Sequence, residues 1–426
     1  MTFDPSRSVL FRGATLIDPA AGREQEDDLL VLDGIISRLS ETPPGLREYD
    51  ARGLHVAPAF IDLHAHFREP GGEAAETVAT GSRAFAAGGF TAAVSMPNTR
   101  PPVDSPAAVR RIRELSSAAG LIDILPAAAL TPARSGEQPA DYTALAQAGA
   151  VAFTDDGTTP SDPEVMEAAC RAVARTGGLV MDHAQDPKLE AGGVMHEGER
   201  SRELGLPGIS ASAETDIVER DIAIARMTGC RLHIQHVSAA ASVDLIRAAK
   251  KEGLPVTAEA TPHHLAFCDR DIDPGNTNFK VNPPLRSARD REALLAGVRD
   301  GTLDVFATDH APHTAEAKAR GFIDAPFGMV GAETAAGATF TTTVLAGILS
   351  PLEWVRRWTT APAAILGRPA PSLAPGARAD LVCLDLDHEW VVDPERFHSK
   401  SRNSPFCGKT LTGRAAATLF RGRFTP

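Results

Sequence analysis

The fold is decided by the stretch Ile61-Asp62-Leu63-His64-Ala65-His66-Phe67-Arg68. Apolar and polar side chains alternate along it, which is the pattern of a β-strand with one side against a core. The alternation predicts one polar face made of Asp62, His64, His66 and Arg68. At the carboxyl end of a barrel strand, where active-site groups gather, two imidazoles on one face can chelate a metal ion. Two surface histidines near a turn are the plainer alternative, and the apolar residues around them favour the metal.

Short apolar strands and longer Ala-rich helical patterns alternate outward from this stretch, from Val56 to about Arg368. This arrangement is typical of a parallel sheet. Eight strands are expected, at Val56–His66, Phe90–Met96, Ile122–Ala128, Ala150–Asp156, Leu179–His183, Arg231–Val237, Pro255–Ala260 and Val305–Asp309. Eight such units predict an α/β fold with a closed (β/α)8 barrel of the TIM type.

The two ends of the chain have a different pattern. Val9–Ile17, Asp28–Leu39 and Ala379–Leu386 alternate or run apolar between Gly and Asp turns, without long helical periods. Proline-rich joints at Pro43-Pro44 and Pro369–Pro375 mark borders. We therefore expect residues 1–55 and 369–426 to combine into one small β-sandwich domain, with the barrel domain at 56–368.

Composition excludes several classes of partner. The chain has 426 residues and a net charge of -12, with no run of Lys and Arg that could neutralise phosphates, so no nucleic-acid partner is expected. No apolar stretch reaches the roughly 20 residues of a membrane span, and the N-terminus lacks a signal-peptide pattern. The five cysteines lie far apart, without zinc-finger or redox spacing, and are expected to be reduced thiols. These features predict a cytoplasmic protein that does not bind a membrane.

Other strand ends carry the same kinds of side chain as the first. Four more predicted strands end in Asp155-Asp156, His183, His236 and Asp309. One such residue is more often an ordinary hydrogen-bonding group, but imidazoles and carboxylates repeated at one end of a barrel suit zinc, manganese or cobalt. Four to six ligands imply one or two divalent ions. By strand parity His233, three residues before His236, is expected to face the outer helices.

Seven segments together identify the chain as a member of the amidohydrolase superfamily that resembles the class I dihydroorotases. They are DLHAHFREPG (62–71), MPNTR (96–100), FTDDG (153–157), TPHHL (261–265), KVNPPLR (280–286), ATDHAPH (307–313) and APFG (325–328). The resemblance covers nearly the whole chain. It implies a hydrolase of de novo pyrimidine biosynthesis that reversibly cyclises N-carbamoyl-L-aspartate to L-dihydroorotate and water.

The same resemblance implies the residues of the site. The metal ligands would be His64, His66, Asp156, His183, His236 and Asp309, holding one or two Zn²⁺ ions, with Mn²⁺ or Co²⁺ as alternatives. Motif alignment selects Asp156 over Asp155 as the bridging ligand. Metal-activated hydroxide would attack the ring, with Asp309 as the catalytic general acid and base. The substrate-binding residues would be Arg68, Asn98 and His313 for the carboxylate, and Asn282 with the Phe327-Gly328 backbone for the ring.

Some alternatives stay open. Asn98 and Asn282 each stand next to proline and can also be read as turn formers, and the polar segment Thr314–Ala325 is either a solvated loop or a lid over substrate. Hydantoinases and allantoinases resemble the chain but bridge their metals with a carboxylated lysine on strand four, and the first lysine here is Lys188. A silent scaffold partner of aspartate transcarbamoylase is disfavoured because all six ligand positions are filled. A complex with that enzyme, or a homo-oligomer, remains compatible with activity.

Overall fold

A closed parallel barrel dominates the computed structural model, which describes residues 3–426. Its strands follow the order β15-β14-β13-β10-β9-β8-β7-β6. They are β6 (Phe60–Ala65), β7 (Phe90–Ser95), β8 (Asp123–Ala128), β9 (Ala152–Phe153), β10 (Leu179–Asp182), β13 (Arg231–Ile234), β14 (Val256–Ala260) and β15 (Val305–Phe306). A parallel bridge between Ala65 and His310 joins the first strand to the chain beyond the last. The predicted α/β barrel is confirmed.

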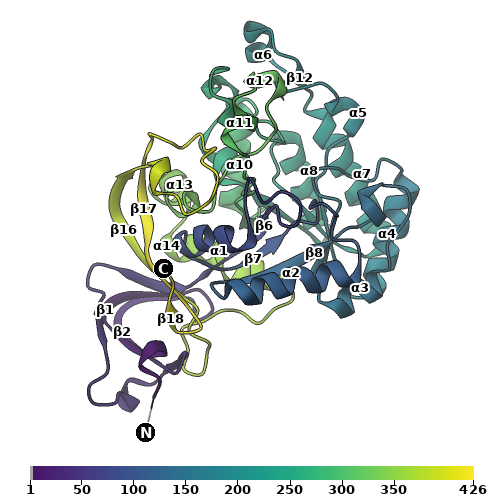
Figure 1. The fold of residues 1–426 in the computed structure, drawn as a ribbon. Helices are drawn as coiled ribbons and strands as arrows, with labels where there is room; N and C mark the ends of the chain where they lie inside the picture. The colour runs from purple at the N-terminus through teal and green to yellow at the C-terminus, as the bar shows by residue number, and fades with distance from the viewer. Residues whose placement is uncertain (1–2) are drawn as a thin grey trace.

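Helices surround these strands (Figure 1). They are α1 (Val78–Ala87), α2 (Pro106–Ala119), α3 (Tyr142–Ala148), α4 (Pro163–Arg175), α7 (Ser212–Thr228), α8 (Ala240–Lys251), α10 (Ala288–Asp300) and α14 (Pro351–Trp358), with α15 (Thr360–Ile365) behind α14. Local sequence sets their ends. Helix α2 begins where the Ser105 side chain accepts the N–H of Ala108, and it ends at Gly120, whose φ of 65° is left-handed.

Longer connections add small elements beyond the carboxyl ends of the strands, at the top of Figure 1. Between β10 and α7 lie α5 (Pro187–Glu190), β11 (Met195–His196), α6 (Glu199–Leu204) and β12 (Gly208–Ile209). Helix α9 (Pro262–Ala266) follows β14. After β15 come α11 (Ala315–Lys318), α12 (Gly321–Asp324), α13 (Ala335–Thr339) and a π-helical turn at Phe340–Val344. Most of these connections form the rim of the barrel, whereas α13 and the π-helical turn pack at its side against β17 (Thr410–Phe420).

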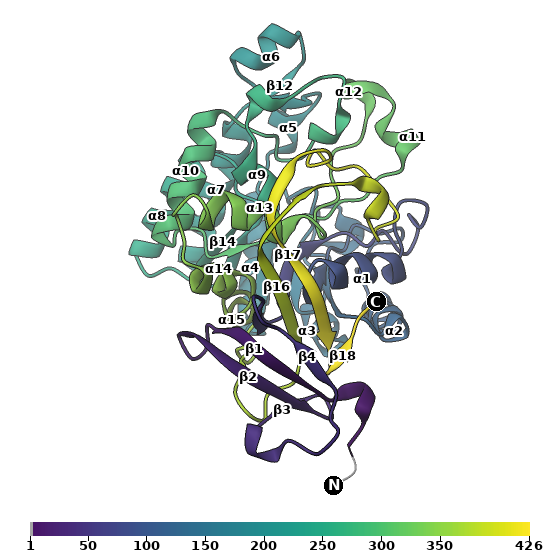
Figure 2. The same cartoon turned by 90° about the vertical axis from the view of Figure 1, so that its left-hand side faces the viewer.

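Both ends of the chain build a second sheet, in the order β18-β17-β16-β5-β1-β2-β3 with β4 beside β1. Its β1–β3 part lies below the barrel, and the long pair β16–β17 runs up along the side of the barrel (Figure 2). Its strands are β1 (Val9–Asp18), β2 (Arg23–Leu32), β3 (Ile35–Ser37), β4 (Glu48–Asp50), β5 (His55–Pro58), β16 (Leu381–Val391), β17 (Thr410–Phe420) and β18 (Arg423–Phe424). Because β5 pairs with β1 and β16, Val56–Pro58 belong to this sheet, and the first barrel strand predicted from Val56 was too long. Only Ala59 separates β5 from β6, so two strands read as one apolar run.

This second sheet curls around its own core. The rings of Phe11 in β1 and Phe424 in β18 lie 6.2 Å apart, centre to centre. Four strand steps would separate them by about 19 Å in a flat sheet. The domain borders themselves stay a prediction.

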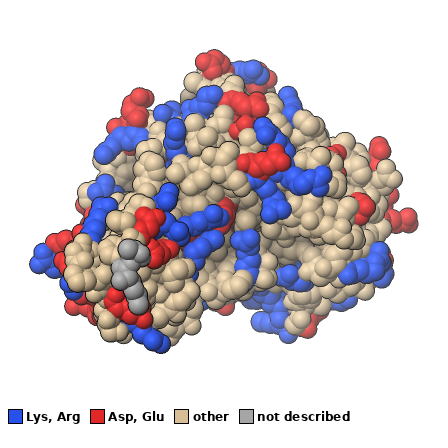
Figure 3. Space-filling model, turned by 60° about the horizontal axis from the view of Figure 1, so that its bottom comes forward, with Lys and Arg blue, Asp and Glu red and all other residues tan. Residues whose placement is uncertain are grey.

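Surface charge and the hydrophobicity of the helices are the features that concern nucleic-acid and membrane partners. On the face shown in Figure 3, acidic and basic side chains stand beside one another. Within residues 3–426 no helix is both long enough and apolar enough to cross a bilayer.

Candidate active site

A hollow of about 240 Å³ opens at the carboxyl ends of the barrel strands. It is lined by His66, Arg68, Asn98, Asp156, Gly157, His183, Glu190, His236, Asn282, Asp309, Ala311, His313, Phe327 and Gly328. Eleven of the twelve residues expected in the site are among them. The twelfth, His64, is fully buried and lies 3.1 Å from Asp156 (Nε2 to Oδ1). The chain therefore brings all of the expected residues to one place.

Two overlapping groups of potential metal ligands form the floor of this hollow. In each group, His64, His66 and Asp156 or Asp156, His183 and His236, the ligand atoms lie within 4.8 Å of one another. Asp309 Oδ1 stands beside the first group, 3.1 Å from His66 Nε2 and 3.5 Å from His64 Nε2. Asp156 belongs to both groups, so its carboxylate lies within reach of all four imidazoles. Asp155 instead accepts the backbone N–H of Thr131 (3.0 Å) and supports that loop.

An orphaned nitrogen shows that the donors fit a cation. Nε2 of His64 is buried, and although it lies 3.1 Å from Asp156 Oδ1, no atom within residues 3–426 meets it in hydrogen-bond geometry. A buried polar atom without a partner costs free energy unless something else binds it. Imidazole nitrogens and carboxylate oxygens around one point are the donor set of zinc and its neighbours.

Strained backbone aims several of these side chains. Arg68, His236 and Asp309 have φ values of 60°, 29° and 46°, in the left-handed region that non-glycine residues avoid. Such residues cluster at functional sites, where the surrounding structure holds them. Strand β13 ends at Ile234, so the chain turns before His236 and strand parity does not continue across it. The expectation that His233 faces the helices is wrong, because it was counted back from His236 across this turn. In the structure His233 Nε2 lies 3.0 Å from Glu259 Oε2, beside the expected ligands.

Glu259 links two of the expected ligands and was not predicted from the sequence. Its Oε1 lies 2.8 Å from His64 Nδ1 and accepts the backbone N–H of His236 (3.0 Å). Burial would raise the pKa of Glu259, but His64 and His233 lower it to about 2. A carboxylate that accepts a hydrogen bond from Nδ1–H keeps the proton on Nδ1 and leaves Nε2 free to bind a metal. The available signal was an acidic residue inside the buried strand β14.

The carboxylates at the floor of the hollow favour the binding of a cation. Burial would lower the pKa of His64, yet Asp156, Asp309 and Glu259 hold it well above its usual value. Burial would likewise raise the pKa of Asp156, but the neighbouring imidazoles of His64 and His66 keep it well below. Three carboxylates therefore surround the His64 imidazole, and a divalent cation bound there would offset their negative charge.

The lining of the hollow also carries a positive charge, that of Arg68. Burial lowers the pKa of Arg68 to about 10, so its guanidinium stays charged at neutral pH. Its Nε donates to the carbonyl of Pro312 (3.1 Å), and Nη2 lies 3.3 Å from His313 Nε2. Burial, and then the charge of Arg68, lower the pKa of His313 to about 3, so this imidazole is neutral. The pair can meet a carboxylate in the hollow.

Asn98 and Asn282 each lie within hydrogen-bond distance of expected metal ligands. Asn98 places Oδ1 3.0 Å from His66 Nδ1 and donates from Nδ2 to Asp156 (3.2 Å), so its amide orients two expected ligands. Asn282 donates to Glu190 (3.1 Å) and lies 3.4 Å from His183 Nε2. Glu190 lines the hollow, and burial raises the pKa of its carboxyl. Nothing in the segment around Glu190 distinguishes it from a surface helix.

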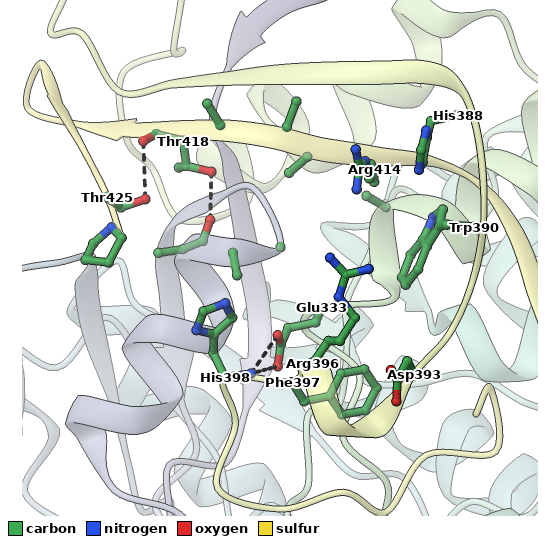
Figure 4. Close-up of a pocket in the computed structure, with 18 of the residues that line it drawn as sticks. Glu333, His388, Trp390, Asp393, Arg396, Phe397, His398, Arg414, Thr418 and Thr425 are labelled. Carbon is green, nitrogen blue, oxygen red and sulfur yellow. Dashed lines mark hydrogen bonds between the residues drawn. The ribbon is translucent and has the colours of Figure 1, made fainter. Parts of the chain in front are cut away.

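A second hollow, of about 360 Å³, lies between α1, α13 and the β16–β17 hairpin (Figure 4). Arg396, Arg414, His388 and Trp390 line it, and Glu333 accepts the backbone N–H of His398 there (2.8 Å). None of the expected site residues reaches it.

Comparisons with known proteins agree with this geometry. A family model described as Dihydro-orotase-like matches residues 53–242. The dihydroorotase of Pelotomaculum thermopropionicum is 48% identical over 97% of each chain, and that of Staphylococcus epidermidis is 42% identical over 93% of this chain and 95% of its own. Among solved structures, L-hydantoinase (dihydropyrimidinase) from Arthrobacter aurescens superposes with a TM-score of 0.85 and 26% identity, covering 99% of this chain and 96% of that one. Dihydropyrimidinase from Brevibacillus agri, at 22% identity and a TM-score of 0.84 over 98% and 94%, shares the fold.

Proposed function

Because the chain belongs to the dihydroorotase family, it is a metal-dependent cyclic amidohydrolase, and we propose that the hollow at the barrel rim interconverts N-carbamoyl-L-aspartate and L-dihydroorotate. One observation carries the assignment of the site. Two groups of potential ligands share Asp156, and they line one hollow together with Arg68. The reaction needs both a cation to activate water and a positive group to hold the substrate carboxylate.

The metal would be held by His64, His66, Asp156, His183, His236 and Asp309. Their nitrogen and oxygen donors favour Zn²⁺, with Mn²⁺ and Co²⁺ as alternatives, and a shared Asp156 favours two ions. A divalent ion there would lower the pKa of water toward neutrality and polarise the scissile carbonyl.

The chain's own residues would orient the substrate and move its protons. Arg68, with His313 and Asn98, would bind the carboxylate of dihydroorotate, since a guanidinium offers paired donors to a carboxylate. Asn282 and the Phe327-Gly328 backbone would contact the ring. In the hydrolytic direction Asp309, which lines the hollow, would accept a proton from the attacking water and deliver it to the ring nitrogen as the amide bond breaks. Cyclisation would use the same residue in reverse.

A related ring, such as a hydantoin or allantoin, is the second candidate, because L-hydantoinase shares 26% identity and the fold. Arg68 and His313 favour dihydroorotate over a hydantoin, whose ring bears no carboxylate. The deciding experiment follows consumption of L-dihydroorotate, hydantoin and allantoin by the purified protein, before and after chelation and metal return. Faster turnover of hydantoin or allantoin, or activity that survives complete metal removal, would contradict the proposal.

Location and assembly are further proposals. Five free cysteines, four of them buried, fit a reducing compartment, which supports a cytoplasmic location. A homo-oligomer, or a complex with aspartate transcarbamoylase, is proposed from the family resemblance alone and is tested by the mass of the protein in solution with and without that enzyme.

A further inference from the structure

Lys318, at the end of α11, is a buried cation without an acidic partner. Its residue is 5% exposed. Within residues 3–426 its ammonium donates only to backbone carbonyls, those of Pro326 (3.0 Å), Gly328 (3.0 Å) and Lys280 (3.4 Å). Burial, and then the charge of Lys280, lower the pKa of Lys318 to about 7. The ammonium offsets this desolvation cost only through its hydrogen bonds to the three carbonyls, so its contacts are with the backbone of the Pro326–Gly328 turn and of Lys280.

One of the carbonyls that Lys318 holds belongs to Gly328, which lines the proposed substrate site, and another belongs to Pro326 in the same turn. Phe327 and Gly328 line the hollow, and Gly328 also donates its N–H to the carbonyl of Lys280 (2.9 Å). The carbonyl of Phe327 is held separately by His313 (2.7 Å). A side chain at Gly328, whose φ is 127°, would come within 2.8 Å of the Ala311 side chain, so the turn is also packed from the other side. Lys318 therefore fixes the backbone that contacts the ring.

Most of the charged residues near Lys318 are basic. A neighbouring hollow of about 510 Å³ is lined by Lys318 together with His313, Lys400, Arg402 and the exposed Glu316. Lys280 approaches from the other side, where its own ammonium donates to the carbonyl of Ile323 (2.7 Å) and lies 4.6 Å from the centre of the Phe327 ring. An anion in the substrate hollow would therefore stabilise the ammonium, and by reciprocity the ammonium would strengthen binding of the anion.

We propose that Lys318 is a positioning residue of the substrate site, which holds the Pro326–Gly328 turn. Anionic substrate binds more tightly when the Lys318 amine is protonated than when it is neutral. The proposal rests on the function proposed above. Segment 314–325 is accordingly an anchored support of the site, and the lysine, outside the metal centre, sets part of the pH dependence of KM.

The test compares Lys318→Met, Lys318→Arg and the matched control Arg320→Met, an exposed cation of the same segment. Lys318→Met is expected to raise KM for both substrates about tenfold with kcat and bound metal nearly unchanged. Lys318→Arg, which stays charged at every pH used, is expected to keep a low KM. The ratio of wild-type KM to that of Lys318→Arg should rise by about tenfold between about pH 6 and about pH 9, as the lysine loses its proton. The control should match wild type.

A wild-type KM in Lys318→Met, or an equal loss in Arg320→Met, would overturn the proposal while leaving the dihydroorotase assignment intact. Titration of the ¹⁵N-labelled lysine amines by NMR gives a reading without turnover. We expect one amine to titrate near pH 7 and to move upward when N-carbamoyl-L-aspartate is added. If every lysine titrates near the usual value of about 10.4 and none responds, the proposal fails. A protein that turns over neither substrate fails the proposed function first.

Discussion

The two ends of the barrel are built from the same eight strands and differ in chemistry. At the amino end, Leu179 and Val305 pack with Ala363 and Ile365 into a buried apolar plug. At the carboxyl end, carboxylates and imidazoles crowd together with left-handed backbone at His236 and Asp309. Apolar packing of this kind stabilises the fold, whereas crowded charges and strain have a cost that function must explain. We therefore expect mutations at the two ends to affect different measurable quantities.

The largest effect is expected at the rim, from Asp309→Asn. The amide keeps the shape and an oxygen donor but cannot carry the transferred proton, so turnover should fall on the order of 10²- to 10⁴-fold. Metal content by elemental analysis and the unfolding temperature should stay near the wild-type values. Near-normal kcat in a metal-loaded variant would end the general acid and base assignment.

At the opposite end Ile365→Ala should show the reverse pattern. The side chain is 7% exposed within the plug, so its truncation should lower the free energy of unfolding by about 2 to 4 kcal/mol through lost burial and a cavity. Denaturant unfolding measures the loss, and kcat/KM of the folded fraction should be unchanged. A large fall in kcat without destabilisation would show that the two ends are coupled and would break the comparison.

The sequence predicted the eight strands because each one carries an apolar run between turn signals, and strand-end polar residues such as His183 could be assigned to the rim. Contacts between strands could not be read in this way. The link from Glu259 to His64 joins residues 195 positions apart, and the role of Lys318 depends on carbonyls that carry no sequence signal. The short break at Ala59 and the turn before His236 were missed because alternation patterns do not reveal where a strand stops.

Glu259→Gln tests whether this buried carboxylate beneath the rim supports metal binding or only the stability of the core. The amide cannot accept the Nδ1–H of His64 with the strength of a carboxylate, and it removes one negative charge from the floor. Metal affinity should fall by about 10- to 100-fold. Competition with a chelator measures this directly, and Glu316→Gln, an exposed acid of the rim, is the control. Unaltered affinity with lowered stability would place Glu259 with the structural core.

Arg68→Lys is expected to have the smallest effect, because the positive charge remains at the rim and only the geometry of the donors changes. A lysine ammonium lacks the planar pair of N–H groups that matches a carboxylate, so KM for L-dihydroorotate and N-carbamoyl-L-aspartate should rise roughly tenfold, with kcat much less affected. Arg320→Lys, in the exposed part of the neighbouring segment, should leave both constants unchanged. If Arg68→Lys binds both substrates as the wild type does, the paired donors of the guanidinium do not hold the substrate carboxylate. Positive charge at the rim would then be sufficient for substrate binding.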